Sequence, residues 1–193
     1  MYTPPVSLTL ALVTCGPQLE VALTGPSLQA VSTVRLAGTS LRSSLVLAAV
    51  DLLLEDAGAE PAALDRVIVS RGPGSFTGIR AGLATAQGLH AASGVEVVAY
   101  GSLAAQAARC AGRSTVWAAQ PGRRGEVYAQ EYELDGSGRP AARGTIRIVP
   151  VAQAAGLGAW VAAEALDLGA AERALAGRTA AEGLLRLATA TTG

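Results

Sequence analysis

The chain of 193 residues contains no lysine and no asparagine, and all fifteen of its basic residues are arginines. A Walker A loop needs its lysine to contact nucleotide phosphates, so that class of phosphate-binding loop is excluded. The missing lysine also excludes a lysine Schiff base and the usual pyridoxal-phosphate chemistry. The single histidine, His90, cannot form a multi-histidine site, so we expect no bound metal.

Cysteine is also scarce. Cys15 and Cys110 lie far apart and form no CxxC pattern, so we expect two free buried thiols in a reducing cytoplasm. No charged residue precedes Glu20, but a basic segment typical of a signal peptide is missing as well, and Pro4 and Pro5 interrupt the apolar residues. We therefore expect neither a signal peptide nor a membrane span.

Aromatic residues make up 4% and charged residues 16% of the chain, against 50% hydrophobic residues. This composition predicts an aliphatic core in one large domain or two small lobes. Fifteen acidic residues balance the fifteen arginines, so no net basic field favours nucleic acid. Arg123 and Arg124 form a basic turn that is too small to bind nucleic acid alone but could contribute to such a site.

The first half of the chain predicts three strands followed by alternating helices and strands. We expect strands over 6–14, 19–24, 28–36, 67–70 and 95–100, and helices over 41–57, 79–92 and 102–111. The close spacing of the first three strands indicates antiparallel hairpins, and the later units indicate βα crossovers. This order predicts an α/β fold of the ribonuclease-H-like type, which is also the core of actin-like ATPases.

The second half begins near Ser114 and predicts strands over 115–119, 126–133 and 145–149. The Ala- and Leu-rich residues from Leu166 onward are expected to be helical. We therefore expect an N-terminal lobe of residues 1–112 and a smaller second lobe of residues 113–193 that includes the C-terminal helices.

A glycine-rich loop joins the strand over 67–70 to the next helix. Its candidate site residues are Gly72, Gly74, Ser75, Thr77 and Gly78. The spacing is GxGxxxG, which differs from the dinucleotide-binding GxGxxG. A loop between a strand and a helix can present backbone N–H groups to an anion, but its glycines can equally serve only a tight turn and close helix packing. The loop leaves both interpretations open.

No catalytic residue is expected. A ribonuclease-H nuclease needs carboxylates on its first strand, which has none here, and Asp51 and Asp65 are interpreted as solvated surface charges. An actin-like ATPase needs an acidic residue at the end of that strand, where residues 12–15 read Leu-Val-Thr-Cys. His90 has no Ser or Cys nucleophile at a recognisable triad spacing.

Three segments resemble the TsaB (YeaZ) family, and the resemblance extends in order over about residues 8–135. They are SRGPGSFTGIRAGLATAQGL over 70–89, YGSLAA over 100–105, and GEVY over 125–128 after the two arginines. The resemblance implies a degenerate actin-like (ASKHA) fold of two lobes. It further implies a non-catalytic subunit in the bacterial synthesis of N6-threonylcarbamoyladenosine in tRNA. In that family the subunit dimerises with the catalytic paralogue TsaD, and the ATPase TsaE joins them.

The chain departs from the family pattern at three places. The family's Asp on strand one falls at Val13, its His-Ser-Glu falls at residues 42–44 (Arg-Ser-Ser), and its Asp in the second lobe falls at Pro121. These differences remove remnants of a nucleotide site. We therefore expect no cofactor and no ATP hydrolysis, although the sequence leaves residual nucleotide binding open.

The helix over 41–57 carries two apolar stripes, whereas a helix that lies on a sheet needs only one. One stripe is Leu41, Leu45, Ala48, Ala49 and Leu52, and the other is Leu47, Val50 and Leu54. On the next helix, small residues recur at four-residue intervals and would let a partner helix approach closely. The expected partner interface is Leu47, Val50, Leu54, Ile79, Gly82 and Ala86. Alternatively, a further layer of the same chain covers both stripes.

These observations predict a scaffold subunit that pairs with a TsaD-like transferase and a TsaE-like ATPase, and that meets tRNA through the complex. Two alternatives stay open. One is a weak nucleotide-dependent phosphotransferase that uses the loop over 72–78. The other is an orphan paralogue that forms only a homodimer.

Overall fold

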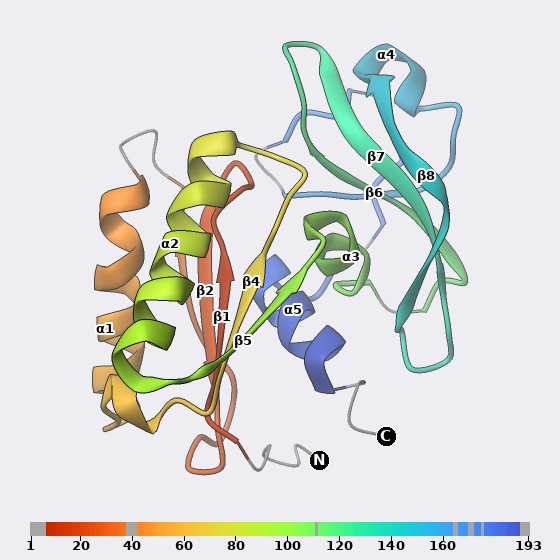
Figure 1. The fold of residues 1–193 in the computed structure, drawn as a ribbon. Coiled ribbons are helices and arrows are strands. Elements are labelled where there is room, and N and C mark those ends of the chain that lie inside the picture. The colour runs from red at the N-terminus through yellow and green to blue at the C-terminus, as the bar shows by residue number, and fades with distance from the viewer. Residues whose placement is uncertain are drawn as a thin grey trace.

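The computed structural model describes residues 7–37, 42–110, 112–163, 166–169, 172–174 and 176–189. These residues form two lobes, each built on one β-sheet (Figure 1). The elements of the first lobe are β1 (Thr9–Val13), β2 (Leu19–Thr24), β3 (Ser32–Leu36), the 3-10 helix η1 (Arg42–Leu45), α1 (Val46–Asp56), the 3-10 helix η2 (Pro61–Ala63), β4 (Arg66–Ser70), α2 (Phe76–Ser93) and β5 (Glu96–Tyr100). The remaining elements are α3 (Ser102–Ala107), β6 (Thr115–Pro121), β7 (Glu126–Leu134), β8 (Pro140–Pro150), α4 (Val151–Ala154), β9 (Trp160–Val161) and α5 (Ala180–Thr189).

The first sheet has the strand order β3-β2-β1-β4-β5. The hairpin strands β1, β2 and β3 pair antiparallel, whereas β4 pairs parallel to β1 and β5 pairs parallel to β4. Parallel strands need long crossovers, which α1 and α2 provide. This topology confirms the predicted ribonuclease-H-like α/β fold.

Helices cover both faces of the first sheet (Figure 1), with α1 and α2 on one face and α5 on the other. Successive side chains of a strand point to opposite faces, so β1 supplies both layers. Leu10 and Leu12 belong to the core beneath α1 and α2, whereas Ala11 and Val13 belong to the core beneath α5. This double burial explains why β1 is apolar at almost every position.

The second sheet has the order β8-β7-β6-β9, and α3 packs against it at β6 and β7. On its other face the rings of Trp117 and Trp160 lie 5.5 Å apart between centroids. Leu168 joins the core around these two rings.

The expected helix from Leu166 onward is wrong for most of its length. The described residues between 166 and 179 form loops and isolated bridges, and the helix begins only at Ala180. Apolar residues there, such as Leu168, fill the tryptophan core instead of forming a helical stripe. Periodicity in an Ala-rich segment does not distinguish these two roles.

The assignment of the C-terminal helical residues to the second lobe is also corrected. α5 packs on β1, β2 and β4 of the first sheet and on α3.

Two smaller differences concern element ends. The third strand begins at Ser32 instead of residue 28, and η1 precedes α1. The expected first residue of that helix, Leu41, lies outside the described residues.

Candidate functional site

The glycine-rich loop lies between β4 and α2, at the carboxyl ends of the parallel strands β1 and β4. Ser75 is the N-cap of α2, and its Oγ accepts a hydrogen bond from the Gly78 N–H at 3.2 Å. The Ser75 N–H donates to the Cys15 carbonyl oxygen at 2.8 Å. The strand–loop–helix geometry is as expected. The N–H groups of Ser75 and Gly78, however, already donate hydrogen bonds to acceptors of the same chain.

The close approach of residues 14 and 15 explains two of the glycines. A Cβ atom on Gly78 would lie 2.1 Å from the Thr14 carbonyl oxygen, and one on Gly74 would lie 2.3 Å from the Cys15 carbonyl oxygen. Gly74 also has a φ of +148°, which side chains rarely permit. The Thr14 hydroxyl donates to the Gly78 carbonyl oxygen at 2.7 Å, which ties the end of β1 to α2. These contacts favour the packing interpretation of the loop over the anion-binding one.

Small polar side chains surround the inner end of the loop. The Cys15 Sγ lies 3.3 Å from the Ser70 Oγ, and the Ser102 hydroxyl donates to the Pro73 carbonyl oxygen at 2.5 Å. Burial raises the pKa of the Cys15 thiol, although hydrogen bonds from Ser70 and Ser102 act in the opposite direction. At neutral pH this thiol is therefore protonated and a poor nucleophile.

Thr77 occupies the first turn of α2 and is exposed. Its neighbour Phe76 is 72% exposed, and the Arg80 guanidinium lies 5.6 Å from the centroid of the Phe76 ring. The outer side of this turn therefore presents an aromatic ring and a cation to solvent.

The outward face of α1 differs from the expected one. Val50 and Leu54 are 1% and 2% exposed and pack in the core against the sheet, together with Val46, Ala49 and Leu53. Leu47 is 56% exposed, Leu52 is 55% exposed and Leu45 is 37% exposed. The prediction that Val50 and Leu54 lie outward with Leu47 is wrong, because α1 turns a stripe drawn from both sequence patterns toward the sheet.

The small residues of α2 also face inward. Gly82 and Ala86 are buried, and a Cβ on Gly82 would lie 2.4 Å from the Thr14 Oγ1. Gly82 permits a close approach to Thr14, just after β1, and Ala86 packs in the chain's own core, so their expected place in a partner interface is wrong. Ile79 is half-buried. A Cβ atom on Gly72 would lie 2.7 Å from the Ile79 Cδ1.

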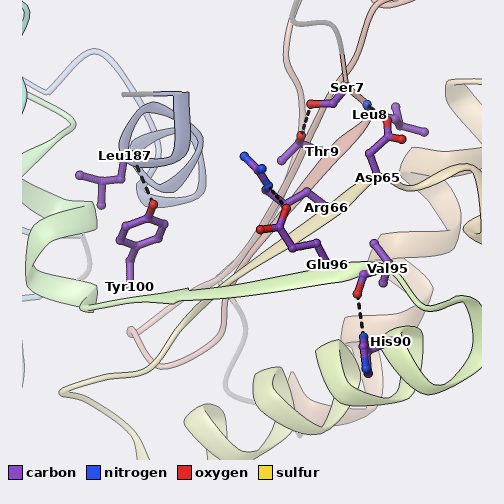
Figure 2. Close-up of polar contacts among 10 residues, drawn as sticks. All are labelled: Ser7, Leu8, Thr9, Asp65, Arg66, His90, Val95, Glu96, Tyr100 and Leu187. Carbon is purple, nitrogen blue, oxygen red and sulfur yellow. Dashed lines mark hydrogen bonds and ion pairs between the residues drawn. The ribbon is translucent and has the colours of Figure 1, made fainter. Parts of the chain in front are cut away.

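His90 has a structural role at the end of α2. Its Nδ1 lies 2.8 Å from the Val95 carbonyl oxygen, as Figure 2 shows, and this contact fastens the helix to the start of β5. In the described ranges, no group of three or more His, Cys, Asp or Glu side chains is placed to hold a metal ion. None of the helices that the structure describes has both the length and the apolar character needed to cross a membrane.

Comparisons with known proteins agree with this fold. The family model described as TsaD, tRNA N6-adenosine threonylcarbamoyltransferase, matches residues 41–182. A curated relative, the tRNA threonylcarbamoyladenosine biosynthesis protein TsaB of Escherichia coli (strain K12), is 39% identical over 98 residues. That match covers 48% of this chain and 42% of the relative, so the chain spans less than half of the relative's length.

Two solved structures from Pseudomonas aeruginosa are similar over most of the chain. One, described as YeaZ, has a TM-score of 0.75 at 28% identity, and the match covers 96% of this chain and 92% of that structure's chain. The other is described as an uncharacterized protein with similarity to peptidase YEAZ. It has a TM-score of 0.74 at 29% identity, and the match covers 96% of this chain and 91% of that structure's chain. The chain belongs to the TsaB (YeaZ) group of this TsaD-type family.

Two departures from the TsaB (YeaZ) pattern can be located in the structure. Val13 is 1% exposed and packs in the core beneath α5, so the end of β1 presents no carboxylate. Pro121 ends β6 and pairs with Val127 across the turn between β6 and β7. At the third departure, residues 42–44, the side chains of Arg42 and Ser43 lie outside the described residues, and Ser44 is exposed.

Arg123 and Arg124, which adjoin the GEVY segment of the TsaB (YeaZ) resemblance, are both exposed in the turn between β6 and β7.

The structure also places Glu20 in a role that sequence reasoning missed. Glu20 is 3% exposed, and its Oε2 accepts hydrogen bonds from the N–H groups of Ala180 and Ala181 at the start of α5. A lone acid within the apolar strand β2 was the signal that could have identified it.

Proposed function

We propose that this TsaB (YeaZ) family member is a non-catalytic subunit in the formation of N6-threonylcarbamoyladenosine in tRNA, and that it pairs with a TsaD-type threonylcarbamoyltransferase. The observation that carries the proposal is the exposed apolar side of η1 and α1, which we call the outer face of α1 and define as Leu45 (the last residue of η1), Leu47 and Leu52. Each of these leucines is at least 37% exposed. α1 also contacts α2, whose first residue, Phe76, is 72% exposed.

The outer face of α1 supplies enough apolar surface to contribute to association. Burying one leucine side chain stabilises by about 1.5–3 kcal/mol, so three could contribute several kcal/mol before the entropic costs of binding. A single exposed leucine is ordinary on protein surfaces, but three within eight residues, with an exposed aromatic ring on the neighbouring helix α2, are typical of an interaction surface.

The proposed absence of catalysis and of a cofactor is supported by the loop over 72–78. Its free space is taken by the backbone of Thr14 and Cys15, and Val13 supplies no acid at the end of β1. We expect no heat of binding and no turnover when Mg²⁺-ATP is titrated into the purified chain. Stoichiometric binding with turnover that is lost on changing Thr77 would favour the phosphotransferase alternative instead.

The proposal also includes a cytoplasmic complex in which a TsaE-like ATPase joins and tRNA is held through the assembly. Because the net charge is zero, the isolated chain should bind tRNA weakly and with a shallow salt dependence. A steep dependence that flattens on changing Arg123 and Arg124 would show instead that this turn contacts tRNA directly.

The pairing is tested with Leu47→Arg and Leu52→Arg, using the TsaD-family subunit of the same genome as the probe. We expect each variant to keep its circular-dichroism melting curve and to lose co-purification with that subunit. Ile148→Arg is the matched control, because Ile148 is 60% exposed on the distant strand β8. Normal pairing by both leucine variants would place the interface elsewhere. Light scattering of the isolated chain tests the homodimer alternative on the same face.

A further inference from the structure

A hollow of about 170 Å³ lies where the two lobes meet, between the end of α3, the turn that joins β7 to β8, and α5. The turn belongs to the second lobe, whereas α5 packs on the first sheet. We call this hollow the junction pocket. Its described lining includes the arginines Arg139 and Arg186 and no acidic residue. The pocket is therefore a cationic cavity that both lobes help to build.

The fold fixes the position of Arg186 at the wall of the junction pocket. Its Nη1 donates to the Ala108 carbonyl oxygen at 2.6 Å, and its Nη2 donates to the Ser137 carbonyl oxygen. A Cβ on Gly138 would lie 2.8 Å from Nη2, so this glycine lets the turn approach the guanidinium closely. Both of these acceptors are neutral backbone groups. They orient the guanidinium without cancelling its charge.

The charges near Arg186 are mainly positive. Burial lowers the pKa of the Arg186 guanidinium, and the charge of Arg178 lowers it further, whereas Asp135 acts in the opposite direction. Arg139 adds another cation to the lining. The Oδ1 atom of Asp135 accepts three hydrogen bonds within its own turn. Because a partly desolvated cation among like charges is destabilised, an anion in the pocket would stabilise it.

The volume and charge of the junction pocket select a small oxyanion as its ligand. A cavity needs only about 10–15 Å³ to hold one water molecule, so 170 Å³ is ample for a phosphate, sulfate or carboxylate group. Guanidinium groups bind such oxyanions through charge-assisted and often paired hydrogen bonds. A metal cation would be repelled by the same two arginines.

A longer polyanion is disfavoured by the surface beside the junction pocket. A second hollow of about 230 Å³ shares Arg139 and Pro140 with the pocket, and its lining also includes Glu133 and Asp135. Further phosphates of an RNA strand or of ATP would meet these two carboxylates on this side. A single phosphate or carboxylate group avoids them.

We propose that the junction pocket binds a small oxyanion, a phosphate or carboxylate group, between Arg139 and Arg186. Arg139 lies in the turn of the second lobe, and Arg186 lies on the helix that covers the first sheet. A bound oxyanion therefore links the two lobes and stabilises the folded chain by mass action. The inference is independent of the proposed pairing through the outer face of α1.

The test is thermal unfolding of the full chain in phosphate and in chloride at equal ionic strength, together with calorimetric titration of inorganic phosphate. Equal ionic strength removes the effect of screening. We expect phosphate to raise the melting temperature and to bind once per chain. Arg139→Gln should weaken this binding about tenfold, as expected for the loss of a charge-assisted hydrogen bond. The turn should persist, because Arg139 contacts Asp135 through its backbone N–H.

Arg113→Gln is the matched control, because Arg113 is outside the pocket lining and its exposed side chain pairs with Glu172. This variant should bind phosphate as the wild type does. Acetate replaces phosphate in a parallel titration, and binding of either ion that depends on Arg139 supports the proposal and identifies the group.

Three results would overturn the proposal. The first is no binding of either ion by the wild type. The second is binding that Arg139→Gln leaves unchanged or that Arg113→Gln weakens equally, since both point to an effect outside the pocket. The third is a short uridine oligonucleotide that binds more tightly than phosphate and depends on Arg139, which would assign the pocket to RNA.

Discussion

At the scale of single residues, Glu20 joins the first hairpin to the last helix across 160 positions of sequence. Its carboxylate accepts the N–H groups of Ala180 at 2.5 Å and Ala181 at 3.2 Å, two donors that a helix cannot satisfy internally. The negative charge also meets the positive end of the α5 dipole. Thr179 and Glu182 complete the same end with a reciprocal capping box.

Removing this carboxylate should destabilise the fold. Glu20→Ala leaves two buried donors without an acceptor and is expected to lower the free energy of unfolding by about 2–3 kcal/mol, measured by urea denaturation. Glu96→Ala is the control, because Glu96 is 54% exposed and only pairs with Arg66 (Figure 2); an exposed pair contributes less than about 1 kcal/mol. Equal effects of the two changes would contradict the proposed role of Glu20.

Tyr132 provides a pH-dependent prediction. Burial raises the pKa of Tyr132 to about 12, and its hydroxyl donates to the Gln130 Oε1 at 2.8 Å. In the unfolded chain a tyrosine ionises near pH 10, at about its reference value. The contribution of Tyr132 to stability is therefore fully present below pH 10 and is lost as the pH rises toward 12.

An absorbance titration at 295 nm, which follows phenolate formation, checks this prediction. Of the four tyrosines in the chain, one should ionise later than the others in the folded protein. That delayed step should disappear in Tyr132→Phe and in denaturant. Simultaneous ionisation of all four tyrosines near pH 10 while circular dichroism still reports the native fold would refute it.

At the scale of elements, the first turns of α2 lie against Thr14 at the end of β1, whereas Gly88, nearer the end of the helix, faces open space. Gly78 contacts the backbone of Thr14, and Gly82 contacts the Thr14 side chain, whereas a Cβ on Gly88 would meet nothing within 4 Å. Glycines in one helix therefore have different roles. The first two permit the close approach of helix and strand, and Gly88 contributes only backbone freedom.

Alanine substitutions at Gly78 and Gly88 should change the stability of the fold in opposite directions. Gly78→Ala places a methyl group 2.1 Å from a carbonyl oxygen that belongs to the backbone, so the helix must shift and stability should fall by at least about 1–3 kcal/mol. Gly88→Ala should raise stability by about 0.5–1 kcal/mol, because alanine favours an exposed helix interior. Thermal denaturation of both variants tests the pair, and stabilisation by Gly78→Ala would show that α2 is not confined by residue 14.

At the scale of the whole molecule, the C-terminal helix packs against the N-terminal lobe. α5 returns from the second lobe to cover the face of the first sheet that α1 and α2 leave open, and α3 lies beside it (Figure 1). Leu184 and Ala180 of α5 pack with Ala11 and Ile68 of the sheet. The first lobe therefore depends on the last helix, and the two lobes cannot be divided at one point of the sequence.

A truncation tests this dependence. Deletion of residues 179–193 should abolish the cooperative unfolding transition, because it exposes one apolar face of β1 and β4 and removes the donors that Glu20 accepts. A synthetic peptide of residues 179–193 added to the truncated chain should restore part of the transition. If the truncated chain melts at the temperature of the full chain, α5 is not part of the core of the first lobe.

The sequence by itself determined the order of strands and helices in the first lobe, the loop over 72–78 and the family. These features follow from local signals: apolar runs bounded by Gly and Pro, helical periodicity, and an uninterrupted motif over residues 70–89. Element ends differed by a few residues where capping and pairing decide them, as at Ser32 and Ala107.

Only the tertiary structure decided which side chains face outward. Both stripes of α1 are apolar, so periodicity gives no preference, and the sheet selected Val50 and Leu54 for burial while leaving Leu47 and Leu52 exposed. The inward orientation of Gly82 and the contact between Glu20 and α5 likewise join segments that are distant in sequence. Such relations depend on how the elements pack in three dimensions, and no local pattern of residues specifies them.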